Sequence, residues 1–122
     1  MEITSNHQKN HVIFSIKGNL HQKVGDQTLK LAIQDYIEND IVYFGFDFSE
    51  TTYFNSAIVN LLFYCYKQVF SRNGTISLIA PNFNQEEALR LVGIHKISSI
   101  YSSEEDFVKD IEIKKSEGSF RF

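Results

Sequence analysis

The sequence has few of the features that mark secreted, membrane-spanning or disulfide-bonded proteins. Its single cysteine, Cys65, excludes an internal disulfide and fits a reducing compartment. Its longest apolar run, residues 57–66, is much shorter than the ~20 residues that a membrane span needs. The first ten residues lack the charged and apolar regions of a secretory signal. We therefore expect a cytoplasmic protein that does not insert into membranes.

Catalytic and nucleic-acid-binding features are also scarce. With 12 basic and 15 acidic residues the net charge is −3, and no cluster of Lys and Arg could neutralise a run of phosphates. The 6 glycines form no phosphate-binding loop. Cys65 lies among apolar residues of a predicted helix, and His7 and His11 lie in a predicted strand and turn, where a spacing of four does not favour a metal site. We expect no enzyme, no cofactor, no metal and no nucleic acid.

The order of apolar patterns predicts a single α/β domain. A chain of 122 residues with 43% hydrophobic residues can bury one core. Alternating or continuous apolar runs predict strands, and apolar residues at helical spacing predict helices between them, which gives a mixed sheet of about five strands with about four helices. We expect residues 1–113 to form the domain and residues 114–122 to form a flexible tail. The predicted strands are 2–5, 12–17, 41–48, 75–80 and 97–101, and the predicted helices are 22–39, 56–71, 84 to about 93, and one from 104.

Two local signals delimit the helix that follows Pro81. Asn84, with Glu87 three residues later, resembles a capping box at its start. Gly93 is suited to a left-handed residue at its end. We expect a short helix between them.

The junction between the central strand and the second helix is the most informative segment. Asp47 ends the strand, and Asn55 and Ser56 open the helix. Both can cap it, and the Ser56 hydroxyl would lie at the positive end of the helix dipole, where a phosphate is stabilised. Ser56 is therefore either a regulatory serine or only a cap, and Asn55 either a cap or a recognition residue. Asp47 is either a solvent-facing acid or the polar end of a buried strand.

The second helix has two apolar stripes. The first contains Ile58 and Leu61, whereas Val59 and Phe63 begin a second stripe one residue along. Neighbouring elements either cover the second stripe or leave part of it exposed to a partner.

This segment resembles the signature of STAS domains, the family of bacterial anti-sigma factor antagonists. Asp47 matches the acid that ends the strand, and Ser56 matches the phosphorylatable serine. The likeness extends from residues 12–18 to residues 100–107. The chain departs from the family pattern at Asn55, where Asp is usual, at Ile58, where Gly is usual, and at His21, where Asp is common. Further positions that match its small and apolar residues are Phe54, Ala57, Leu61 and Leu62.

The resemblance implies a non-enzymatic regulator of transcription that binds a protein partner. The partner would be an anti-sigma factor with serine kinase activity, and phosphorylation of Ser56 would control binding. The domain would be a monomer or weak homodimer. An adaptor subunit of a signalling or transporter ATPase assembly, without phosphorylation, is the alternative, and a small-molecule module is a third possibility. The residues expected to bind the partner are His21, Asn55, Ser56, Ala57, Val59, Asn60 and Phe63.

Overall fold

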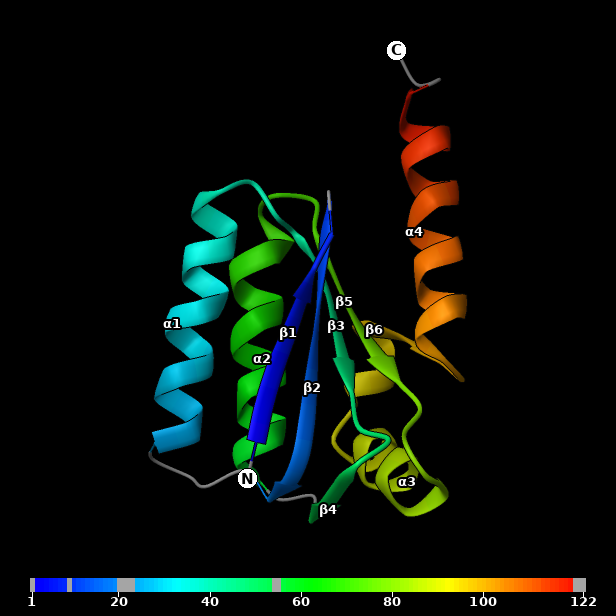
Figure 1. Ribbon diagram of the computed structural model, residues 1–122. Helices are drawn as coiled ribbons and strands as arrows, with labels where there is room; N and C mark the ends of the chain where they lie inside the picture. Colours follow the sequence, from blue (N-terminus) through cyan, green and yellow to red (C-terminus); the bar gives the residue numbers. More distant parts are fainter. Residues whose placement is uncertain (1, 9, 20–23, 54–55, 120–122) are drawn as a thin grey trace.

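The computed structural model describes residues 2–8, 10–19, 24–53 and 56–119 of the chain. These residues form four α-helices and a mixed sheet, as the sequence predicts. In chain order the elements are β1 (Glu2–His7), β2 (His11–Asn19), α1 (Val24–Glu38), β3 (Tyr43–Asp47), β4 (Thr51–Tyr53), α2 (Ser56–Phe70), β5 (Thr75–Ile79), α3 (Phe83–Leu91), the 3-10 helix η1 (Ile94–Lys96), β6 (Ser98–Tyr101) and α4 (Glu104–Ser119), shown in Figure 1.

The main sheet has the strand order β1-β2-β3-β5-β6. Strands β1 and β2, both predicted from the sequence, pair antiparallel as a hairpin. The pairs β2–β3, β3–β5 and β5–β6 are parallel, so β3 is the central strand that its apolar run predicted. Parallel strands share one direction, and their carboxyl ends therefore meet at one edge of the sheet.

Helices cover both faces of the sheet in different amounts. Helices α1 and α2 lie side by side over one face, and α4 lies over the other (Figure 1). Short helix α3 and strand β4 lie at the edge where β2, β3 and β5 end (Figure 1). The structure thus has three layers, which are the α1–α2 pair, the sheet and α4. The larger core lies between the sheet and the α1–α2 pair.

Strand β3 sends its side chains alternately into these two cores. Phe44 and Phe46 are fully buried on the side of α1 and α2. Gly45 faces the other side, where a Cβ atom would lie 2.9 Å from Ile79 Cδ1 and 3.1 Å from Phe107 Cε2. Glycine at this position allows α4 to approach the sheet, because any larger residue would displace Phe107.

The second apolar stripe of α2 is largely covered. Val59, Phe63 and Tyr66 are half-buried, whereas Phe70, at the end of the helix, is 65% exposed. Helix α1 also holds the polar edge of α2, since the Gln34 side-chain amide donates to the Tyr64 hydroxyl at 2.6 Å. Coverage by neighbouring helices therefore accounts for most of this stripe.

Three details differ from the sequence predictions. Strand β4 and the 3-10 helix η1 were not predicted, because each has only three residues and no periodic pattern. The capping box joins Asn82 to Gln85, so the prediction of Asn84 and Glu87 was wrong by two residues. Both pairs have the same spacing and chemistry, and only the backbone geometry distinguishes them. Gly93 has a φ of 83°, which confirms the predicted left-handed residue after α3.

The last helix is longer than the sequence predicted. It continues to Ser119, whereas the predicted flexible tail begins at residue 114. Lys and Glu, which recur in this segment of the sequence, are good helix formers, and this favours continuation of the helix past the predicted boundary. The Ser103 hydroxyl accepts a hydrogen bond from Asp106 N at 3.2 Å and so caps the start of the helix.

Within the described residues, no helix combines the length and the apolar character needed to cross a membrane.

Replacement of Gly45 by Ala should destabilise the protein by roughly 1–3 kcal/mol, because the new methyl group overpacks the contact with Phe107. Urea unfolding of the two proteins measures the difference. The Phe107→Leu variant makes room at the same contact, so the double variant should lose less than the sum of the two single losses. Additive losses would show that Gly45 does not set the position of α4.

Candidate partner-binding site

Ser56 is the first residue of α2, and it is exposed. The helix begins at the edge where the parallel strands end, close to β4 (Figure 1). The next two residues, Ala57 and Ile58, are buried and anchor the first turn in the core. The serine is thus presented outward on a fixed support. A group attached to its hydroxyl would meet the unpaired N–H groups of the helix start and the positive end of the dipole.

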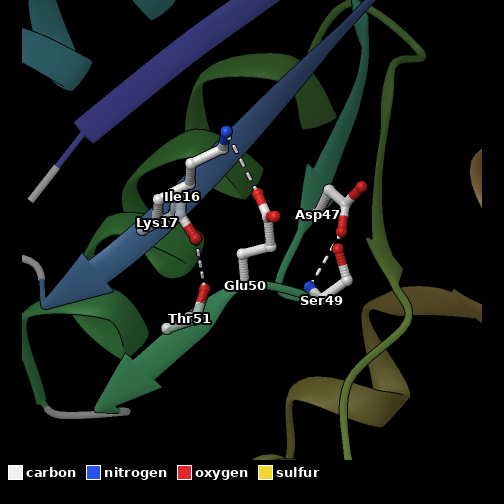
Figure 2. Close-up of polar contacts among 6 residues, drawn as sticks. All are labelled: Ile16, Lys17, Asp47, Ser49, Glu50 and Thr51. Carbon is white, nitrogen blue, oxygen red and sulfur yellow. Dashed lines mark hydrogen bonds and ion pairs between the residues drawn. The ribbon is translucent and has the colours of Figure 1, made fainter.

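A tight turn connects β3 to β4 ahead of this helix. Asp47 accepts a hydrogen bond from Ser49 N at 2.8 Å, so its side chain closes the turn (Figure 2). Thr51 N in turn donates to Phe48 O at 3.1 Å, and the buried Thr51 hydroxyl donates to Ile16 O at 2.7 Å (Figure 2). These bonds attach β4 to the end of β2, ahead of α2.

Two further contacts hold the β3–β4 turn and strand β4, one from the side of β2 and one from the side of α3. Lys17 Nζ lies 3.3 Å from a Glu50 carboxylate oxygen, and Figure 2 shows this pair spanning β2 and the turn. Both side chains are about half exposed, so the ion pair adds little stability. On the other side, the buried Gln85 side chain of α3 donates to Thr51 O at 3.2 Å. Strand β4 is therefore fixed between β2 and α3.

Asp47 is only 8% exposed, which favours its interpretation as the polar end of a buried strand. Its side chain forms a hydrogen bond with the Glu104 carboxyl group at the start of α4. This bond, together with burial and the negative charge of Asp47, raises the pKa of Glu104 to about 7. Burial acts to raise the pKa of Asp47, but hydrogen bonds from Glu104 and Ser49 outweigh it and leave that pKa below its ordinary value. Below about pH 7 the pair therefore holds one proton, which Glu104 carries and shares with Asp47 through the hydrogen bond.

The structure brings some of the predicted site residues together and leaves others apart. Asn60 is exposed one turn beyond Ser56, and Val59 and Phe63 are half-buried beside it. Ala57 is buried, so its side chain supports the helix rather than the surface. Asn55 and His21 lie outside the described residues. Glu104 and Gln85 were not predicted, because nothing local in the sequence shows that they approach the β3–β4 turn.

The remaining candidates for chemistry are inert or dispersed. Cys65 is fully buried, and burial raises the pKa of its thiol, so the reactive thiolate is not formed at neutral pH. Across the part of the chain that the structure describes, no three His, Cys, Asp or Glu side chains are placed to hold a metal ion.

The sequence model of the STAS domain family matches residues 2–107. The chain belongs to the STAS domain family. Among curated proteins, none matches it.

Solved structures show the same STAS fold at low sequence identity. The anti-sigma factor antagonist SpoIIAA in its unphosphorylated form aligns with a TM-score of 0.76 and 13% identity, covering 91% of this chain and 98% of that one. SpoIIAA of Bacillus in its phosphorylated form gives a TM-score of 0.76 and 12% identity, covering 90% and 99%. An anti-sigma factor antagonist domain protein of Planctomyces limnophilus gives 0.77 and 16%, covering 90% and 97%. The chain therefore spans nearly the whole length of each.

The shared proton makes the stability of this STAS domain depend on pH. The pKa of Glu104 is about 7 in the folded protein and near its ordinary 4.5 when unfolded, so folding favours the protonated acid. The contribution of Glu104 to the free energy of unfolding is complete below about pH 4.5 and is lost as the pH rises through 7. The lowered pKa of Asp47 acts in the opposite sense, because its contribution is lost as the pH falls below the ordinary 3.8.

We therefore expect the free energy of unfolding to fall between pH 5.5 and pH 8.5. Glu104→Gln should remove this decrease, since an amide donates permanently to Asp47. Urea unfolding at the two pH values measures both effects. Glu105→Gln, which changes an exposed acid in the same turn, should keep the wild-type pH profile. If the Glu104→Gln variant had the same pH dependence of unfolding as the wild type, the result would contradict a proton shared between Glu104 and Asp47.

Proposed function

We propose that this domain is a non-enzymatic regulator that binds a partner protein through the surface around Ser56. The partner is an anti-sigma factor with serine kinase activity, and phosphorylation of Ser56 weakens the complex. The observation that carries this proposal is the exposed position of Ser56 at the first turn of α2. Exposed Asn60 and half-buried Val59 and Phe63 extend the same surface along the helix.

Phosphorylation at this position changes the surface and leaves the fold intact. It adds roughly −1.5 to −2 charges at pH 7 and three acceptor oxygens. The helix dipole and the free N–H groups of the first turn offset that charge within the domain. A partner surface that fits the neutral serine receives no such compensation and loses complementarity. The two forms of SpoIIAA, which align equally well with this chain, are consistent with a switch that needs no refolding.

An adaptor subunit that is never phosphorylated is the alternative. Ile58 and Asn55 depart from the kinase-facing motif of the family, and both departures favour this alternative. The Ile58 side chain is completely buried, so its bulk does not cover Ser56. Ile58 therefore no longer favours the adaptor, and only Asn55 does. The switch remains the preferred function.

Incubation with ATP and the anti-sigma factor kinase of the same organism should add one phosphate, detected by intact-mass analysis. Ser56→Ala should abolish the modification, because the acceptor hydroxyl is gone. Ser71→Ala is the matched control, since it removes an exposed serine just beyond the other end of α2. Modification that persists in Ser56→Ala would exclude Ser56 as the site.

Ser56→Asp should weaken capture of that kinase by at least about tenfold, because a misplaced charge in an interface costs more than ~1.4 kcal/mol. Binding of wild type and variant can be measured by surface plasmon resonance. Ser71→Asp adds the same charge outside the proposed surface and should bind like wild type. Equal affinity of wild type and Ser56→Asp would favour the adaptor.

A further inference from the structure

A cavity of about 450 Å³ with a mixed polar and apolar lining is found on the face of the sheet that α4 covers, and the proposed partner-binding surface does not use it. Its volume is within the range of small-molecule sites. One wall comes from the β1–β2 hairpin and the other from α4. The described residues that line it are Asn6, Gln8, Asn10, His11, Ile13, Glu104, Val108 and Glu112.

His11 is the most unusual residue of this lining. It is only 4% exposed, and its ring packs edge-to-face on Phe107 with centroids 5.5 Å apart. Nδ1 lies 3.1 Å from Asn10 Oδ1, whereas Nε2 is buried and has no hydrogen-bond partner in the described structure. A buried polar atom without a partner is costly, so an incoming group that pairs with it is favoured.

The chemistry of the missing partner follows from the state of the ring. Burial and the nearby His7 lower the pKa of His11, and Glu112 only partly opposes them, so the ring is neutral at pH 7. Because Asn10 Oδ1 can only accept, Nδ1 carries the proton, and Nε2 is left as an acceptor. A ligand in this cavity would therefore pair with His11 Nε2 through a hydrogen-bond donor.

The charges of the wall indicate that this donor is cationic. Glu112 and Glu104 both line the cavity, Glu104 sharing one negative charge with Asp47 when that pair holds its proton, and no Lys or Arg is among the described lining residues. The two acids are eight residues apart on α4, which separates them by about 12 Å along the helix axis. Val108 lies midway between them, and with Ile13 it provides an apolar surface between the two charged ends.

We propose that this cavity binds a linear polyamine, with its terminal ammonium groups at Glu104 and Glu112 and an N–H group directed to His11 Nε2. An extended aliphatic chain with two amine ends matches the alternation of acid, apolar surface and acid along α4. This site is independent of the proposed switch at Ser56.

The test is a titration of the full chain with spermidine, followed by ¹⁵N NMR of the His11 ring and by calorimetry. We expect saturable 1:1 binding that shifts the Nε2 resonance. The diamine 1,3-diaminopropane is too short to reach both acids and should bind more weakly. Octanedioate has similar length and opposite charge and should not bind. Binding of octanedioate, or a spermidine titration that leaves Nε2 unchanged, would overturn the proposal.

Two variants separate the cavity from general attraction to an acidic protein. Glu112→Gln should weaken spermidine binding roughly three- to fivefold, the effect of one exposed ion pair. Glu105→Gln removes the same charge from an exposed position of α4 outside the lining and should have no effect. Equal losses in the two variants would show nonspecific binding. His11→Phe keeps the ring contact with Phe107 and should also weaken binding, and if it does not fold, the glutamate pair still decides the outcome.

Discussion

The burial of β3 on both faces is the constraint on which the rest of the structure depends. Phe44 and Phe46 fill the core beneath α1 and α2, and Gly45 leaves the space into which Phe107 of α4 packs. The strand ends at Asp47, which the same packing brings beneath the first turn of α4. A carboxylate at that depth needs hydrogen-bond donors, and Ser49 N and the Glu104 carboxyl group provide them.

The same constraint gives the candidate binding surface its rigidity. The β3–β4 turn is held by the Asp47 side chain, and β4 is held between β2 and α3 through Thr51. Helix α2 then begins with an exposed serine above two buried residues. A charge added to that serine alters the surface while the supporting contacts stay in place. Regulation by surface charge is thus compatible with a fold that does not move.

Most elements could be predicted because their patterns are long and periodic. The run from Ile41 to Phe48 identified the central strand, and the first stripe of α2 identified the buried side of that helix. Strand β4 could not be predicted, because three residues carry no period, and Asn82 could not be distinguished from Asn84, because each has a suitable partner three residues later. Family resemblance identified Ser56 as a candidate, and the structure then showed that its side chain is exposed.

By itself, the sequence determined the fold class, the family and the serine at the start of α2, because each of these depends on local pattern and spacing. Only the tertiary structure decided that Asp47 is paired with Glu104, that Ile58 is directed into the core, and that His11 faces a cavity bordered by two acids of α4. These contacts join segments far apart in the chain. Periodicity describes which side of an element is buried, but not which remote side chain it will meet there.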